Sequence, residues 1–179
     1  IYEQAYPVKL WGKSFVVTNT FINTSSGKTS DRVKITASED NTTIKINGMI
    51  VFYLDEGESY EYTLDNTIGS AFIETSNPSA VYLYMEGTRI SLSGDPAMIW
   101  IPPVDAMIQS AYFGKISSGL SVTYGISSFK YCIIVNSIDT SRIQLNGSSL
   151  SNWTKVNGNE AYAFIIKDFT QNQVSNHII

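Results

Sequence analysis

Histidine and cysteine, the side chains behind most nucleophilic catalysis, occur once each in this 179-residue chain, as His177 and Cys132. A Ser-His-Asp or Cys-His mechanism needs an imidazole held beside the nucleophile, and no Gly-x-Ser-x-Gly elbow is present. A structural zinc site needs several Cys or His ligands. We therefore expect neither nucleophilic catalysis nor a transition-metal site.

Carboxylates offer a second kind of catalysis. A glycosidase needs only two acidic residues at a suitable separation, and the acidic residues of the predicted turns are candidates: Glu39, Asp40, Asp55, Glu56, Glu58, Asp95 and Asp105. Most of them lie beside Gly, Asn or Pro, where a solvated acid is the ordinary occupant. We predict that the chain is not an enzyme and keep a carbohydrate-active enzyme as a distant alternative.

Calcium is the one ion that the acidic turns suggest. It takes six to eight oxygen ligands, which Glu39 and Asp40 in one turn and Asp55 and Glu56 in another would supply. No EF-hand loop is present, and such carboxylates equally cap the backbone of their own turns. No cofactor is predicted, and calcium remains a candidate at these four residues.

Tryptophan suggests binding rather than catalysis, because an exposed indole stacks on a sugar ring or anchors a protein partner. The stretch Gly94-Asp95-Pro96 is typical of a turn lock. The alternative is that Asp95 shapes a groove between two modules together with Trp100 and the Pro102-Pro103 pair. Our candidate binding residues are Asp95, Trp100 and Trp153.

Four Asn-x-Ser/Thr sequons are candidate glycosylation sites, beginning at Asn23, Asn41, Asn146 and Asn152. The chain has 13 Asn and 38 Ser and Thr residues. Such a composition generates about three sequons by chance, so their number is compatible with secretion and no more. Asn41 and Asn146 lie at predicted turns, where a glycan is sterically tolerated.

The composition excludes two classes of partner. The 12 Lys and Arg residues are scattered among 16 Asp and Glu residues, so no row of positive charge matches a phosphate backbone. The longest apolar stretches, 49–54 and 97–101, are far shorter than the ~18–20 residues of a membrane-spanning helix. We expect no nucleic-acid binding and no membrane span. Because the sequence begins at Ile1 without a signal region, we also expect a piece of a longer protein.

The elements expected to position these side chains are short strands. Alternating β-branched and aromatic residues predict eleven of them, at 15–18, 33–36, 43–46, 50–54, 60–64, 71–75, 81–85, 121–124, 131–135, 142–145 and 161–166. Turn signals lie between them, including Asn47-Gly48, Asn77-Pro78, Asn146-Gly147 and Asn157-Gly158. Cys132 is expected at a buried strand position, where cysteine acts as a small hydrophobe.

Only one segment has a helical period. Apolar residues recur at positions 104, 107, 108, 111 and 112, just after a proline pair. We therefore expect at most one short helix, near residues 104–113. Parallel sheets need crossover connections, which are usually helical, so the predicted fold is all-β, with antiparallel sandwich or jelly-roll-like modules.

An internal repeat predicts two related modules. Residues 33–48 align without gaps on residues 132–147, with six identities in sixteen positions that include the two Asn-Gly pairs. We place the first module at residues 1–98 and the second at 99–179. The second module lacks a counterpart of the strand at 81–85 and is either truncated or completed elsewhere.

Five segments carry a family resemblance: WGKSFVV at 11–17, DRVKITASEDNTTIKING at 31–48, LDEGESYEY at 54–62, IGSAFIETSNPSAVYLY at 68–84 and GDPAMIWIPPVDA at 94–106. Their order and spacing resemble those of the IgGFc-binding protein N-terminal domain family. The resemblance extends more loosely through Trp153 and the segment 162–164 to the ending at 176–178.

The resemblance implies a β-rich, non-enzymatic adhesion module that belongs to a larger extracellular protein, either secreted or at the cell surface. It also implies that this module holds protein or glycan partners. Members linked to mucins are rich in cysteine and this chain has one, so IgG binding is not carried over. A second hypothesis is a structural module that self-associates, or pairs with neighbouring domains, by adding a strand to an unpaired sheet edge of the second repeat.

Overall fold

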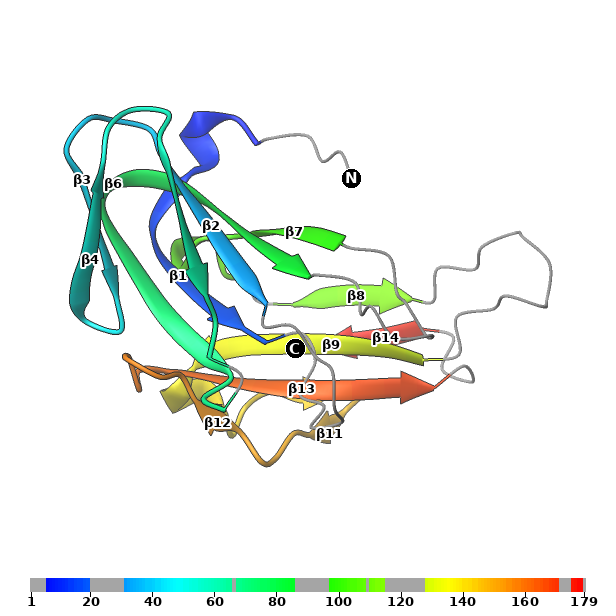
Figure 1. The fold of residues 1–179 in the computed structure, drawn as a ribbon. Coiled ribbons are helices and arrows are strands. Elements are labelled where there is room, and N and C mark those ends of the chain that lie inside the picture. Colours follow the sequence, from blue (N-terminus) through cyan, green and yellow to red (C-terminus); the bar gives the residue numbers. More distant parts are fainter. Residues whose placement is uncertain are drawn as a thin grey trace, which may run out of the picture. The chain divides into compact units, whose positions relative to one another are not determined.

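The structure is a computed structural model that describes residues 6–19, 31–65, 67–85, 97–108, 110–114, 128–170 and 175–178. Its regular elements in these ranges are strands and one-turn 3-10 helices, and every strand pairing is antiparallel (Figure 1). The predicted all-β, antiparallel fold class is confirmed. The chain forms two compact units, residues 1–107 with 156–159, and residues 108–155 with 160–179.

The first unit contains one seven-stranded sheet. Its strands are β1 (Gly12–Thr18), β2 (Arg32–Ala37), β3 (Thr42–Ile46), β4 (Met49–Leu54), β5 (Ser59–Thr63), β6 (Ser70–Met85) and β7 (Ala97–Ile101), accompanied by the 3-10 turns η1 (Val8–Leu10) and η2 (Val104–Ala106). The sixteen-residue β6 pairs with every other strand except β4 and β5. It is therefore the central strand of the unit.

The long strand β6 changes partners along its length, and Figure 1 shows it curving. Residues 70–75 pair with β1 and β3, whereas residues 80–85 pair with β2 and β7, and Ser79 at the bend pairs with both Gly12 of β1 and Ala37 of β2. The sheet thus forms two layers that share β6, namely β4-β3-β6-β1 and β5-β2-β6-β7. Side chains hold the intervening bend: Lys13 Nζ donates to the Ser76 carbonyl at 2.9 Å and Thr75 Oγ1 to the Asn77 carbonyl at 2.8 Å.

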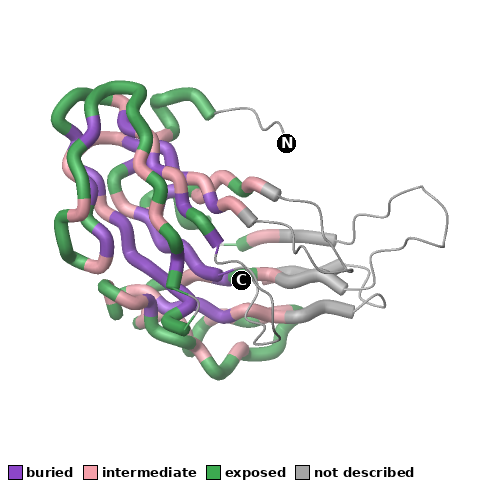
Figure 2. The backbone as a smooth tube through the Cα atoms, viewed as in Figure 1, coloured by how far each residue is buried: buried purple, intermediate pink, exposed green. Residues whose placement is uncertain are grey.

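The core of this unit lies between the two layers. Alternate residues of the strands point inward, as the period of two along a strand requires, and Figure 2 shows the buried positions on these strands. Both layers contribute to the cluster of fully or almost fully buried apolar side chains: Phe15, Val17, Ile44, Ile46, Leu54, Ala71 and Ile73 from one, and Val33, Ile35, Ala37, Leu64, Val81 and Leu83 from the other. Burial of these side chains is the main stabilising term for the unit.

Four residues from late in the chain complete the first unit. In the turn 156–159, the Asn157 carbonyl accepts the Phe72 backbone N–H at 3.1 Å, and the Asn157 N–H donates to Ser70 Oγ at 3.1 Å. Val156 is buried. Phe72 and its cross-strand partner Val16 are buried too, although both lie outside the central cluster. This turn is therefore an integral part of the first unit.

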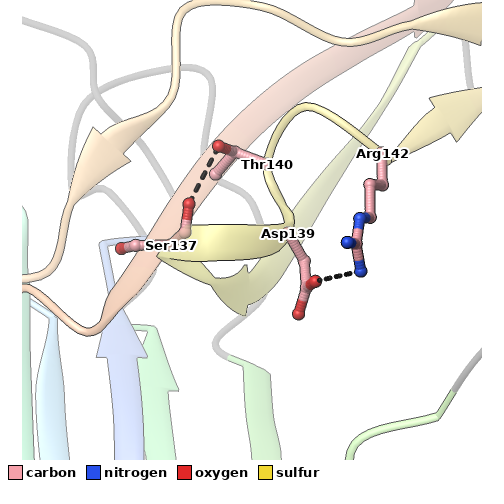
Figure 3. A network of polar contacts seen from close by, with 4 residues as sticks. All are labelled: Ser137, Asp139, Thr140 and Arg142. Atoms are coloured by element: carbon pink, nitrogen blue, oxygen red, sulfur yellow. Dashed lines mark hydrogen bonds and ion pairs between the residues drawn. The ribbon is translucent and has the colours of Figure 1, made fainter.

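The second unit contains two smaller sheets, β11-β10-β14-β8 and β12-β13-β9. Its elements are β8 (Ala111–Gly114), β9 (Ser128–Asn136), η4 (Ser137–Asp139), β10 (Gln144–Leu145), β11 (Ser148–Ser149), β12 (Thr154–Lys155), β13 (Tyr162–Thr170) and β14 (Ser175–Ile178). The turn after β9 is held by local polar contacts (Figure 3). Thr140 Oγ1 donates to the Ser137 carbonyl at 3.0 Å, and Arg142 lies 3.4 Å from the Asp139 carboxylate.

The prediction of at most one short helix near residues 104–113 is confirmed for the described residues of this segment, where the one-turn η2 forms before β8 begins at Ala111. Other local predictions differ from the structure. The predicted strands at 71–75 and 81–85 are one strand, with Asn77-Pro78 at its bend rather than in a turn. Cys132 is exposed and not buried. Side chains alternate between the two faces of β9, so Cys132 points away from the face on which Ile133 is buried. The predicted strand at 121–124 lies outside the described residues.

The Asn-Gly turns are as predicted. Asn47 and Gly48 have φ of 52° and 80°, and Asn146 and Gly147 have φ of 52° and 78°. Each pair joins two antiparallel strands that pair immediately beside it, Ile46 with Met49 and Leu145 with Ser148. These are the positive φ angles that a two-residue hairpin turn requires.

Candidate functional site

The predicted binding residue Trp100 lies on the outer face of the first unit. It belongs to β7, and its ring stacks on that of Tyr6 with the centroids 4.2 Å apart and the planes inclined by 28°. A hydrogen bond fixes the backbone of Tyr6, because its carbonyl accepts Trp11 Nε1–H at 2.9 Å. The Trp100 Nε1 donor is buried and has no hydrogen-bond acceptor among the described residues. An unpaired buried donor of this kind costs about 1–3 kcal/mol.

Two tyrosines extend this surface across β6. Tyr82 lies directly opposite Trp100 in the ladder, so the two side chains share one face of the sheet. Tyr84 is two residues further along β6 and therefore points to the same side. All three side chains are half-buried, which leaves part of each ring accessible to a partner. We call Tyr6, Tyr82, Tyr84 and Trp100 the aromatic face.

Charged residues continue the same face on the next two strands. Lys34 of β2 lies opposite Tyr82, and Arg32 lies opposite Tyr84. Glu61 of β5 follows Lys34 in the ladder and lies 3.9 Å from the Arg32 guanidinium. The outer face thus changes from aromatic at β7 to charged at β5. Ring faces beside hydrogen-bonding side chains are the groups that a sugar or a polar peptide surface requires.

The proline pair beside Trp100 has a structural role in the first unit. Pro103 is buried against Gly12, where an added Cβ would lie 2.7 Å from the proline Cγ. Pro102 is exposed, and η2 begins at Val104. This packing fixes the chain's exit from β7. The groove predicted between two modules at this point stays a prediction.

The other predicted binding residues are not part of the aromatic face. Asp95 lies outside the described residues. Trp153 belongs to the second unit and precedes β12; it is half-buried, and its Nε1–H donates to the Leu150 carbonyl at 3.2 Å. Its indole donor is therefore satisfied locally, unlike that of Trp100. The functional assignment of Asp95, Trp100 and Trp153 stays a prediction.

The four calcium candidates lie in two adjoining turns. Asp40 Oδ1 accepts the Glu56 N–H at 2.9 Å, and Asp55 Oδ1 accepts the Asn41 N–H at 3.2 Å. Glu39 is exposed, and its carbonyl accepts Thr42 Oγ1–H at 2.6 Å. Each aspartate thus caps a backbone N–H of the opposite turn. Within the described ranges no three His, Cys, Asp or Glu residues are grouped so as to hold a metal ion, and calcium binding stays a prediction.

Two titrating groups near the end of β5 have shifted pKa values for structural reasons. Hydrogen bonds from Thr67 lower the pKa of Asp65, because its carboxylate accepts Thr67 Oγ1–H at 2.6 Å and the backbone N–H at 2.7 Å. Burial raises the pKa of Tyr62, and the negative charge of Asp65 raises it further. Both shifts follow from the packing and turn geometry of the first unit.

The described sequon asparagines are all exposed and have positive φ, and two of them, Asn41 and Asn146, lie in turns. Asn41, Asn146 and Asn152 have φ of 55°, 52° and 67°. Asn23 lies outside the described residues. Attachment of a glycan at any of the four stays a prediction.

Two surfaces of the first unit were not predicted from the sequence. Tyr82 and Tyr84 were assigned only to a strand, although their spacing of two puts them on one face. The stretch at 49–54 was predicted as a strand and as too short to span a membrane, but its exposure was not predicted; as β4 it exposes most of its large side chains. The described part of the chain contains no helix long and apolar enough to cross a membrane.

Comparison with known proteins returns one family. The family model described as IgGFc binding protein matches residues 1–179, the whole chain. No curated protein and no solved structure matches the chain significantly.

Proposed function

The chain belongs to the IgGFc-binding protein family, and from that premise we propose that it is a non-enzymatic, extracellular or cell-surface binding module of a larger protein. It holds a protein or glycan partner on the aromatic face. The observation that carries this proposal is the stacked pair of Tyr6 and Trp100, which continues through Tyr82 on the outer side of a sheet.

The chemistry of the aromatic face favours a partner with apolar faces and polar edges. A sugar ring stacks its C–H face on an indole, and its hydroxyls accept and donate hydrogen bonds at the rim. Lys34 and Arg32 lie opposite the two tyrosines and offer further donors.

The acidic turns support binding over hydrolysis. A glycosidase needs two carboxylates that face each other across the substrate. Asp40 and Asp55 instead each accept a backbone N–H of the opposite turn, and Glu58 accepts the Asp55 N–H of its own turn. We therefore propose no catalytic residue.

A glycan and protein array tests the proposal. The purified chain is screened with calcium and with chelator, alongside Trp100→Ala and the matched Trp153→Ala. We expect saturable binding that falls at least ~10-fold in Trp100→Ala and is unchanged in Trp153→Ala. Loss of binding with chelator would place calcium at the site. The absence of any saturable ligand, or equal loss in both variants, would count against the aromatic face.

A further inference from the structure

The strand β4 exposes an unusual amount of apolar surface for its length. Four of its six residues are large hydrophobic residues with exposed fractions of 69% for Met49, 54% for Ile50, 47% for Phe52 and 63% for Tyr53. Scattered exposed hydrophobic residues are ordinary, but a continuous run of them marks an interaction surface.

One edge of the β4 backbone pairs with β3, and its other edge has no strand partner among the described residues, although the Phe52 ring stacks on Tyr60 of β5 with centroids 5.0 Å apart. Among the described residues, β4 pairs only with β3 and forms one end of the strand order β4-β3-β6-β2-β5. The strand contains neither a charge nor a proline, the two features with which natural edge strands prevent pairing. One protective feature is present, a β-bulge at Val51 where the ladder with β3 shifts by one residue.

The charges at the two ends of β4 favour pairing with the β4 strand of a second copy of this chain, running in the antiparallel direction. The strand runs into Asp55, Glu56 and Glu58, all exposed. Its other end begins at the neutral Asn47-Gly48 turn, with the exposed Lys45 of β3 opposite Ile50. A parallel copy would place the acidic ends side by side. An antiparallel copy places each acidic end toward the partner's neutral turn and lysine, and does so twice by symmetry.

We propose that β4 pairs antiparallel with the β4 of a second copy of this chain and closes a two-fold dimer. The register centred on the strand pairs Met49 with Leu54, Ile50 with Tyr53, and Val51 with Phe52. Only six residues pair and the bulge bends the strand, so the interface is small. The dissociation constant is therefore on the order of 10 µM. This proposal does not depend on the aromatic face, which belongs to the other layer of the sheet.

Sedimentation velocity on the full chain over ~1–200 µM tests the dimer. Wild type should shift from monomer to dimer across this range, and Tyr53→Lys should raise the dissociation constant at least ~10-fold, because the pairing would bury an unpaired charge. The matched control is Ile138→Lys on η4, where the isoleucine is 86% exposed. It should dimerise like wild type. Unchanged thermal unfolding shows that each variant is folded.

A charge-pair mixture tests the antiparallel register directly. Ile50→Lys and Tyr53→Glu should each be monomeric alone, and an equimolar mixture should recover the dimer because the two introduced charges lie opposite each other. A monomeric wild type, a dimer that survives Tyr53→Lys, or equal loss in Ile138→Lys would overturn the proposal. The proposal would also be overturned if the wild type were monomeric and the β4 variants no longer bound a ligand found on the array. That result would show that β4 pairs with a strand of another protein.

Discussion

Gly158 packs directly against Asn47, although 111 positions separate them in the sequence. A Cβ added to Gly158 would lie 2.6 Å from Asn47 Oδ1 and 2.7 Å from Asn47 Cβ. The same Oδ1 accepts the Phe72 backbone N–H at 3.0 Å. Two turns from distant parts of the chain therefore meet on one residue of the central strand, and only glycine leaves room for the contact.

This contact predicts a specific cost for Gly158→Ala. Gly158 and Gly147 have nearly the same φ, 82° and 78°, but a Cβ at Gly147 would meet nothing within 4 Å. Both alanine variants should lose about 1–2 kcal/mol of unfolding free energy to backbone strain. Gly158→Ala should lose a further ~1–3 kcal/mol to overpacking. Chemical denaturation of the two variants measures the difference, and equal losses would contradict the contact.

The stack of Tyr6 on Trp100 predicts a measurable coupling. In a double-mutant cycle of Tyr6→Ala and Trp100→Ala, the coupling in unfolding free energy should be about 0.5–1.5 kcal/mol. Pairing Trp100→Ala with Tyr53→Ala on β4 provides a control cycle and should give a coupling near zero. Additive effects in the first cycle would show that the two rings do not stack in solution.

Asp65 predicts a contribution to acid stability. Its pKa is lowered in the folded chain, so the unfolded chain takes up the proton first as the pH falls. The stabilisation is therefore present above the ordinary aspartate pKa of 3.8 and is lost as the pH falls through the lowered value. In a series of denaturation curves from neutral to acidic pH, Asp65→Asn should lose stability less steeply than wild type. Curves for Asp65→Asn that run parallel to those of wild type would refute the prediction.

The exposure of Cys132 predicts its reactivity. The chain has one cysteine, so any thiol signal comes from this residue. A disulfide reagent should modify one equivalent under native conditions, because the accessible thiol needs no unfolding to react. If modification required denaturant, Cys132 would be buried after all.

Local sequence determined the strands and hairpin turns. A hairpin turn depends on the φ preferences of its own two residues. The turns at Asn47-Gly48 and Asn146-Gly147 can therefore be predicted from these residues alone. Alternation likewise identifies most strands, because the period of two is a property of the extended backbone. The same patterns do not state which face is buried, and Cys132 was assigned to the wrong one.

Tertiary structure alone decided which residues meet. The strand β6 continues through Pro78 because side chains from elsewhere in the chain donate hydrogen bonds to its backbone carbonyls at the bend, as Lys13 of β1 does to Ser76. The stack of Tyr6 on Trp100 and the packing of Gly158 on Asn47 join positions that no local pattern relates. The exposure of β4 follows from its place at the end of a sheet. Strand order and burial are set by the total free energy of pairing and packing many segments at once, and the short-range preferences of a sequence do not contain that quantity.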